Sequence, residues 1–135
     1  MELSQVAGDI ERVVVTRDQI QERIKELAKL IEDDYKGRDL LLIGVLKGAV
    51  MVMADLVRAI NRHVETDWMA VSSYGSGTKS SGVVRILKDL DRDITGREVL
   101  IVEDIVDTGL TLHWLKNNLE SRGAKSVEIL SLIHI

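Results

Sequence analysis

Residues 98–111 read EVLIVEDIVDTGLT, and this stretch decides the fold. An apolar run leads to Val102, two acids follow, and the segment 107–111 then changes to small hydroxyl and glycine residues. The apolar run is typical of a strand covered on both faces, and the glycine turn predicts the opening of a helix. A buried strand that leads directly into a helix indicates an α/β protein.

The same alternation extends over the rest of the chain. The patterns predict five strands, at 39–46, 64–73, 83–90, 98–104 and 126–133, and three helices, at 17–36, around 53–60 and at 110–121. Thr16 and Gln19 have capping-box spacing before the first helix, and Gly37 and Gly123 are suitable stops. Short strand–helix–strand connections imply right-handed crossovers, so we expect an open, mostly parallel twisted sheet with helices on both faces.

Composition narrows the class of protein. The 135 residues fit a single domain, 1–135, and 45% apolar with 30% charged residues is ordinary for a globular protein. The formal net charge of -4 speaks against a nucleic-acid partner. No cysteine is available for a disulfide or a thiolate metal site, and no run is long and apolar enough to span a membrane. The N-terminus lacks a secretory signal pattern, so the expected location is the cytoplasm.

The parallel sheet predicts where a ligand would bind. Ligands of open parallel sheets sit beyond the carboxyl ends of the strands, and LKGA (46–49), SSYGSG (72–77) and EDIVDTGLT (103–111) all reach that edge. The glycine turn that opens a helix offers free backbone N–H groups, which suit a phosphate. Glu103 and Asp104 suit sugar hydroxyls and Mg²⁺. A ribose 5-phosphate would satisfy the whole stretch, whereas Asp107 as a simple helix cap would leave the adjacent acid pair unexplained.

Three segments carry a resemblance to a known family. VLIVEDIVDTGLT (99–111) resembles the ribose-phosphate-binding motif of type I phosphoribosyltransferases. Together with GVLKGA (44–49), VSSYGSGTKSSG (71–82) and KDLDRDITGREVLIVEDIVDTGLTL (88–112), it resembles the purine-salvage branch, the bacterial hypoxanthine or hypoxanthine-guanine phosphoribosyltransferases. The resemblance implies transfer of a 5-phosphoribosyl group from phosphoribosyl pyrophosphate to hypoxanthine or guanine, with Mg²⁺ as cofactor, and a homo-oligomer, dimer or tetramer.

The resemblance also implies residue roles around the acidic stretch. Glu103 and Asp104 would hold the ribose hydroxyls with Mg²⁺ nearby, and Asp107 would accept the purine proton. Ile105 would pack on the base. The residues that would cradle the 5-phosphate are Asp107, Thr108, Gly109, Leu110 and Thr111.

Without the family resemblance, the functions of the other two segments, the turn at Lys47 and the loop 74–82, each allow two interpretations. Lys47 alone fits a solvated surface lysine, whereas the family pattern assigns Lys47 and Gly48 to pyrophosphate, often with a strained peptide bond. The loop 74–82 is either a flexible surface loop or a lid over the reaction, and the family favours a lid with Ser73 and Tyr74 as its contact residues. Its glycines match neither a dinucleotide fingerprint nor a P-loop.

The end of the chain departs from the family pattern. Ile135 falls where the family has a lysine that reads the purine oxygen, and no aromatic follows to stack on the base. We therefore expect a chain truncated or divergent at its end, without the base-recognition segment, or one that binds the sugar phosphate and turns over poorly. The alternatives to an enzyme are a non-catalytic phosphoribosyl pyrophosphate-binding module and an RNA-binding pyrimidine-operon regulator.

Histidine and tryptophan suggest no further site. His63, His113 and His134 share no metal-ligand spacing, so each is expected at the surface or in packing. Trp68 and Trp114 lie at inward-facing positions and are expected in the core rather than as stacking platforms.

Overall fold

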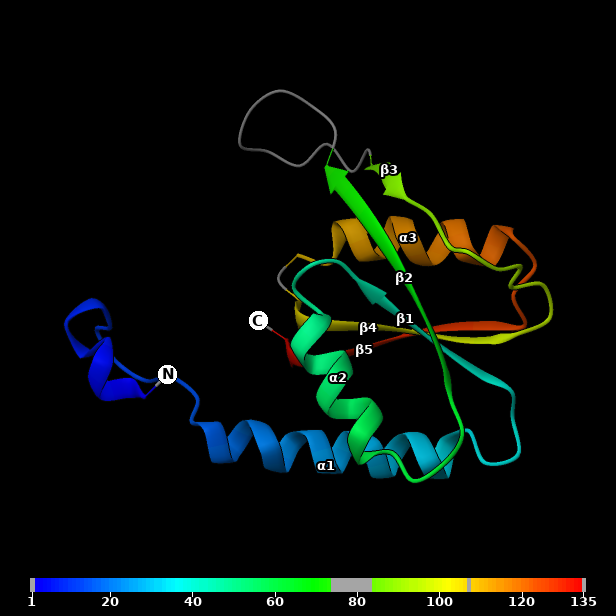
Figure 1. Cartoon of the computed structure of the whole chain (residues 1–135). Helices are drawn as coiled ribbons and strands as arrows, with labels where there is room; N and C mark the ends of the chain where they lie inside the picture. Colours follow the sequence, from blue (N-terminus) through cyan, green and yellow to red (C-terminus); the bar gives the residue numbers. More distant parts are fainter. Residues whose placement is uncertain (1, 74–83, 107, 135) are drawn as a thin grey trace.

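A computed structural model describes residues 2–73, 84–106 and 108–134 of the chain. Its strands form one sheet, and its helices pack against that sheet (Figure 1). The elements are the short 3₁₀ helices η1 (Leu3–Gln5) and η2 (Ala7–Asp9), α1 (Arg17–Asp34), β1 (Leu40–Val45), α2 (Val50–Ala59), β2 (Glu65–Ser73), β3 (Val84–Lys88), β4 (Glu98–Val106), α3 (Leu110–Ser121) and β5 (Ser126–His134). The predicted strands and helices are confirmed, with ends that differ by a few residues.

The five strands form one sheet in the order β3-β2-β1-β4-β5. β1 pairs in parallel with β2 and with β4, β4 pairs in parallel with β5, and β3 runs antiparallel to β2. The register places Gly44 of β1 beside Trp68 of β2 and Val102 of β4. The mostly parallel sheet is therefore confirmed, and β1 and β4, adjacent at its centre, deliver their carboxyl ends to the same edge.

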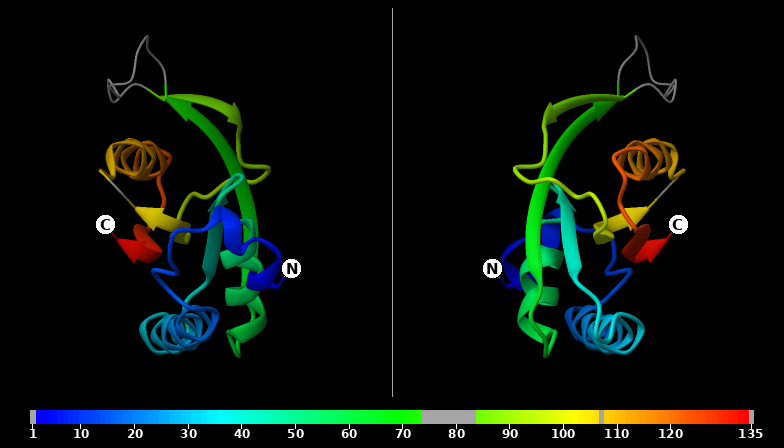
Figure 2. Two further views of the ribbon diagram at one scale, coloured as in Figure 1. Left: turned by 90° about the vertical axis from the view of Figure 1, so that its left-hand side faces the viewer. Right: turned by 90° about the vertical axis from the view of Figure 1, so that its right-hand side faces the viewer.

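Helices cover both faces of the sheet, as expected. α1 and α2 pack on one face and α3 on the other, and Figure 2 shows α1 and α3 on opposite sides of the sheet. All six residues of β1 are buried because helices lie above and below them. Trp68 and Trp114 pack against the two cores, which confirms them as core residues.

Gly44 has a packing reason at the middle of β1. A β-carbon at this position would lie 2.5 Å from the Trp68 ring, so the indole occupies the space that a side chain would need. The close approach of ring and backbone fixes Trp68 against the central strand.

The helix boundaries follow the local signals in the sequence. The Thr16 side chain accepts a hydrogen bond from the Gln19 backbone N–H, and the Gln19 side chain accepts one from the Thr16 N–H, which completes the predicted capping box. Gly37, with φ +76°, lies in the turn after α1, and Gly123, with φ +86°, lies in the turn after α3.

The segment before α1 differs in character from the body of the protein. Residues 2–16 leave the layered core, as Figure 1 shows, and Val14 is 75% exposed. Among the helices of the described ranges, none is long and apolar enough to cross a membrane. The predicted loop 74–82 lies outside the described residues, but the antiparallel β2–β3 pair on either side of it is present.

Candidate functional site

The predicted site residues meet at the carboxyl edge of the sheet. β4 extends to Val106, two residues beyond its predicted end, so that Glu103 and Asp104 lie within the strand, near its end, instead of closing it. The extension follows from pairing with β5, which continues to Val106 opposite His134. The turn 46–49 after β1 and the turn that opens α3 lie at the same edge.

Glu103 and Asp104 form a half-buried acid pair without a cationic partner. Neither carboxylate forms an ion pair with any residue in the described ranges. The Asp104 backbone N–H donates to Glu103 Oε1 at 3.1 Å, and the Ile105 N–H donates to Asp104 Oδ1 at 2.7 Å. Burial, together with the neighbouring Asp104 carboxylate, raises the pKa of Glu103 to about 7. The pair therefore holds an electrostatic cost that a bound cation or hydrogen-bond donor would remove.

The turn 108–111 forms the second part of the site. Gly109 adopts φ +77°, a left-handed conformation that favours glycine, and α3 begins at the next residue. The Leu110 N–H is 3.4 Å from Thr108 Oγ1, a long contact that leaves it available to an anion. A hollow of about 180 Å³ opens here, lined by Glu103, Ile105, Val106, Thr108, Gly109, Leu110, Thr111 and Leu112.

The turn after β1 contributes the third part. Lys47 and Gly48 are exposed, and the Leu46–Lys47 peptide bond is cis. The Leu46 N–H donates to the carbonyl oxygen of Met69 at 2.8 Å, which ties the start of the turn to β2. On its other side the turn reaches Asp104: a β-carbon at Gly48 would lie 3.2 Å from Asp104 Oδ1.

The structure thus brings together most of the predicted site. Ile105 projects beside the acids with 48% of its surface exposed, as a residue that packs on a ligand would. Asp107 and Tyr74 lie outside the described residues, and Ser73 is the last residue of β2. Sequence reasoning missed Val106 and Leu112 as lining residues. The position of Val106 between Ile105 and the glycine turn, and the inward helix position of Leu112, could have indicated them.

A larger hollow lies at the opposite end of the sheet but lacks the chemistry of the first. Its volume is about 560 Å³, and its lining includes Lys36, Arg38 and Arg62. The Arg62 guanidinium already donates to the carbonyl oxygens of Tyr35 and Arg38, so its charge ties α1 to the loop after α2. We therefore place the candidate site at the smaller hollow, where Glu103 of the acid pair adjoins the open N–H groups of the turn.

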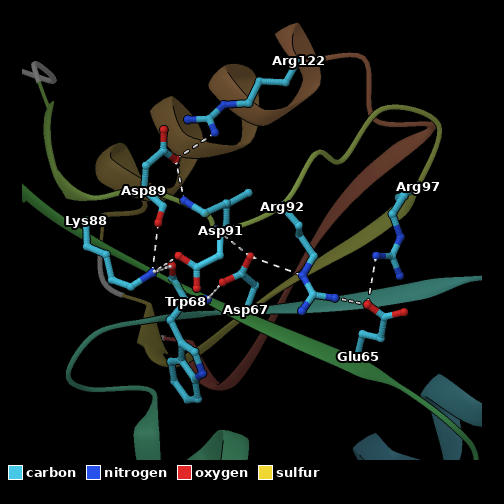
Figure 3. Close-up of polar contacts among 10 residues, drawn as sticks. Glu65, Asp67, Trp68, Lys88, Asp89, Asp91, Arg92, Arg97 and Arg122 are labelled. Carbon is cyan, nitrogen blue, oxygen red and sulfur yellow. Dashed lines mark hydrogen bonds and ion pairs between the residues drawn. The ribbon is translucent and has the colours of Figure 1, made fainter.

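Acidic side chains at that opposite end form hydrogen bonds and ion pairs with other residues of the chain, as Figure 3 shows. Asp67 is only 3% exposed, and it accepts hydrogen bonds from the backbone N–H groups of Trp68, at 2.8 Å, and Asp91, at 3.0 Å. Arg92 lies 3.7 Å from Asp67 and also pairs with Glu65. These contacts identify Asp67 as a structural carboxylate.

Fold and site together define a class. A doubly covered parallel sheet with polar residues at its carboxyl edge, and with a glycine turn opening the next helix, is the arrangement of α/β proteins that bind ligands at strand ends. Within this class, the chain belongs to the phosphoribosyl transferase domain family, whose model matches residues 16–134.

Individual relatives agree with this membership. The chain is 59% identical, over 132 residues, to the hypoxanthine-guanine phosphoribosyltransferase of Mycobacterium bovis, covering 93% of this chain and 65% of the relative. It is 48% identical to the enzyme of the same name from Lactococcus lactis, covering 92% of this chain and 67% of that relative. The chain thus spans about two thirds of the length of these proteins.

Solved structures agree in fold as well as in sequence. A hypoxanthine phosphoribosyltransferase from Staphylococcus aureus superposes with a TM-score of 0.94 at 42% identity, covering 99% of this chain and 73% of the other. The Trypanosoma cruzi hypoxanthine phosphoribosyltransferase, in complex with the product IMP, gives a TM-score of 0.83 at 46% identity, covering 92% of this chain and 71% of the other.

Proposed function

We propose that the chain acts in purine salvage, transferring the 5-phosphoribosyl group of phosphoribosyl pyrophosphate to hypoxanthine or guanine and releasing pyrophosphate. The observation that carries the proposal is the acid pair Glu103–Asp104, half-buried and without an ion-pair partner among the described residues, beside the turn that opens α3. A pentose that bears a diol and a phosphate complements both. The names of the relatives support the purine as acceptor.

The turn 108–111 would hold the 5-phosphate. The first N–H groups of a helix have no partner within it, and the helix dipole adds positive character there. The first hydrogen bond of α3 runs from the His113 N–H to the Gly109 carbonyl at 2.8 Å, so the N–H groups of Leu110 and Thr111 precede the helical ladder. The hydroxyl groups of Thr108 and Thr111 would add two donors.

Glu103 and Asp104 fit a divalent cation as well as a diol. Carboxylate oxygens are suitable Mg²⁺ ligands, and burial raises the pKa of Glu103, which a bound cation would lower again. No group of three or more acidic or histidine ligands converges within residues 2–73, 84–106 and 108–134. Water and substrate oxygens would therefore complete the coordination, as Mg²⁺ favours. When bound, Mg²⁺ would neutralise charge on the pyrophosphate.

The reaction exchanges one bond at the anomeric carbon for another. The bond from C1′ to the pyrophosphate oxygen breaks, the bond from C1′ to a purine nitrogen forms, and the pyrophosphate departs with the electron pair. The transition state resembles an oxocarbenium ion, as in glycoside chemistry. Lys47 and the backbone at Gly48 would hold the pyrophosphate, and Asp107 would accept the proton of the purine nitrogen.

Three further residues would position the acceptor and exclude water. Ile105, exposed beside the acids, would pack on one face of the purine. Ser73, the last residue of β2, and Tyr74, the next residue in the sequence, would contribute contacts that exclude water from the reacting centre.

The experiment that tests this function uses the 135-residue chain itself. The chain is incubated with phosphoribosyl pyrophosphate, Mg²⁺ and either hypoxanthine or guanine, and IMP or GMP is measured by chromatography. An Asp104→Ala chain is the control, because it removes one member of the acid pair. We expect product with the original chain and a large loss with the control.

If no IMP or GMP forms, calorimetry of phosphoribosyl pyrophosphate binding distinguishes the remaining explanations. Binding without product would replace the enzyme by a non-catalytic binding module. If phosphoribosyl pyrophosphate does not bind and structured RNA gives a salt-sensitive gel shift, the chain is an RNA-binding regulator instead.

A further inference from the structure

The turn after β1 and Asp104 of β4 lie side by side at the carboxyl edge of the sheet. Gly44 and Val102 are register partners in adjacent parallel strands, so the chain beyond each emerges at the same edge. A β-carbon at Gly48 would lie 3.2 Å from Asp104 Oδ1, 3.3 Å from Oδ2 and 3.5 Å from Cγ. The Asp104 carboxylate therefore rests against the backbone of the turn, in the space that a side chain at position 48 would need.

This contact leaves little room for adjustment on the Asp104 side. Oδ1 accepts the Ile105 N–H at 2.7 Å, so a carboxylate pushed away from the turn would strain or break that bond. Glu103 precedes Asp104 on the strand, and its Oε1 accepts the Asp104 backbone N–H at 3.1 Å, which further fixes the backbone at Asp104. Because protein packing is dense, a shift of a few tenths of an ångström at one of these groups is transmitted to the other.

Limited space, rather than backbone conformation, explains why position 48 is a glycine. Gly48 is absent from the glycines with positive φ, which are Gly37, Gly96, Gly109 and Gly123. Its backbone is therefore open to other residues, and a substitution acts through the space that its side chain would fill. That space is bounded by the Asp104 carboxylate.

We propose that Gly48 is a positioning residue, which sets the place of the Asp104 carboxylate and so couples the pyrophosphate turn to the ribose-binding acids. The inference rests on the proposed function and deepens it, because phosphoribosyl pyrophosphate would span both segments. The role is separate from any contact of the Gly48 backbone with pyrophosphate. A methyl group at position 48 displaces Asp104 and weakens ligands that never touch the turn.

The test uses ribose 5-phosphate with Mg²⁺, which carries the diol and the 5-phosphate but no pyrophosphate. Calorimetry compares the original chain with Gly48→Ala. Displacing a charged hydrogen-bond acceptor is expected to raise the Kd for ribose 5-phosphate roughly tenfold. An unchanged Kd would overturn the coupling and leave Gly48 with a direct pyrophosphate contact alone.

Gly8→Ala is the matched control. A β-carbon at Gly8 meets no atom within 4 Å, and the residue is not in the left-handed region, so the same chemical change is made where it has room, in the segment before α1. This variant is expected to bind ribose 5-phosphate as the original chain does.

A double-mutant cycle with Asp104→Ala separates an effect through Asp104 from a general loss of folding. If Gly48 acts through Asp104, Gly48→Ala adds no further weakening once Asp104 is alanine. The same cycle is followed by thermal unfolding, because the β-carbon at position 48 then has no carboxylate to meet. Any loss of stability caused by Gly48→Ala should disappear in the Asp104→Ala background, and independent effects would overturn the proposal.

Binding by the original chain distinguishes a failure of the proposed function from a failure of the coupling between Gly48 and Asp104. If the original chain binds neither ribose 5-phosphate nor phosphoribosyl pyrophosphate with Mg²⁺, the proposed function fails and the coupling fails with it. If the original chain binds and Gly48→Ala binds equally well, the coupling alone fails.

Discussion

The carboxylates at the two ends of the sheet differ in whether other residues compensate their charge. At the end where β1, β2 and β4 begin, Asp67 is buried against two backbone N–H groups and Arg92 (Figure 3). Nearby, Arg97 pairs with Asp39 at 2.9 Å and with Glu65 at 3.3 Å. At the carboxyl end, Glu103 and Asp104 have no ion-pair partner within the described part of the chain.

This difference separates structural acids from functional ones. A buried carboxylate that the fold itself satisfies contributes to stability, and its removal leaves its donors unpaired. A carboxylate left uncompensated lowers the stability of the ligand-free fold, and the proposed ligand would complete it. The comparison predicts that mutations at the two ends act on different measurements.

The largest effect is expected for Asp107→Asn, in the sequence between β4 and α3. Loss of the proposed proton acceptor should lower kcat roughly 10²–10⁴-fold, or about 3–5 kcal/mol of barrier, in the transferase assay. Asp91→Asn, whose side chain is 80% exposed at the other end, is the control and should leave kcat unchanged. A kcat for Asp107→Asn within about threefold of the original would remove Asp107 from this role.

The next effect is expected for Asp67→Ala, and it concerns stability. The change removes the acceptor of the Trp68 and Asp91 N–H groups and the partner of Arg92, and should lower the free energy of unfolding by about 2–4 kcal/mol. Urea unfolding measures it. Asp91→Ala keeps its backbone N–H bond to Asp67 and should cost less than about 0.5 kcal/mol. Equal costs for both variants would contradict the structural role of Asp67.

A smaller effect of opposite sign is expected for Glu103→Gln. Burial raises the pKa of Glu103 from 4.5 to about 7 in the folded state, so above pH 7 the group is charged in both states and the fold bears the cost. At pH 8, the free energy of unfolding of the variant should be about 1–2 kcal/mol higher than that of the original chain. This figure is reduced from the full pKa shift because Glu103 is partly exposed to solvent. The gain should shrink as the pH falls from 7 to 4.5 and vanish below.

Urea unfolding of the ligand-free chain at several pH values measures this gain. Glu22→Gln on the exposed side of α1 is the control, because Glu22 is exposed in the ligand-free chain. A gain that does not depend on pH would contradict the burial of an uncompensated charge at Glu103.

The smallest effect is expected at the Asp89–Arg122 pair. The Arg122 guanidinium, 2.8 Å away, lowers the pKa of the Asp89 carboxyl below its usual range. The resulting stability is present above the unfolded-state pKa near ~3.9 and is lost as the pH falls through the lower folded-state value. Because the pair is partly exposed, with 51% of the Asp89 side chain and 28% of the Arg122 side chain accessible, Asp89→Asn should cost at most about 0.5 kcal/mol at pH 7.

Thermal unfolding of Asp89→Asn at pH 7 and at pH 2 tests this effect. The difference from the original chain should be small at pH 7 and absent at pH 2. Asp93→Asn is the control, because Asp93 bonds Thr95 locally rather than an arginine of another element. A cost for Asp89→Asn well above that expected of an exposed pair would show that the contact also holds α3 against the loop after β3.

Local patterns were sufficient for most of the fold. The capping box at Thr16 and Gln19, the apolar run of β1 and the glycine turn before α3 each act within a few residues, so each could be recognised from the sequence. The end of β4 could not, because its last residues are ordered by pairing with β5, a segment about 28 positions later.

For the candidate site too, some features follow from the local sequence and others only from the tertiary structure. The sequence alone determined that Glu103, Asp104 and the turn 108–111 adjoin at a strand end, because they are neighbours along the chain. It could not determine that Gly48 rests on Asp104, or that Asp67 is satisfied while Glu103 is not. Only the tertiary structure decided these points, because the compensation of a charge depends on groups that strand register and crossovers bring from distant parts of the chain.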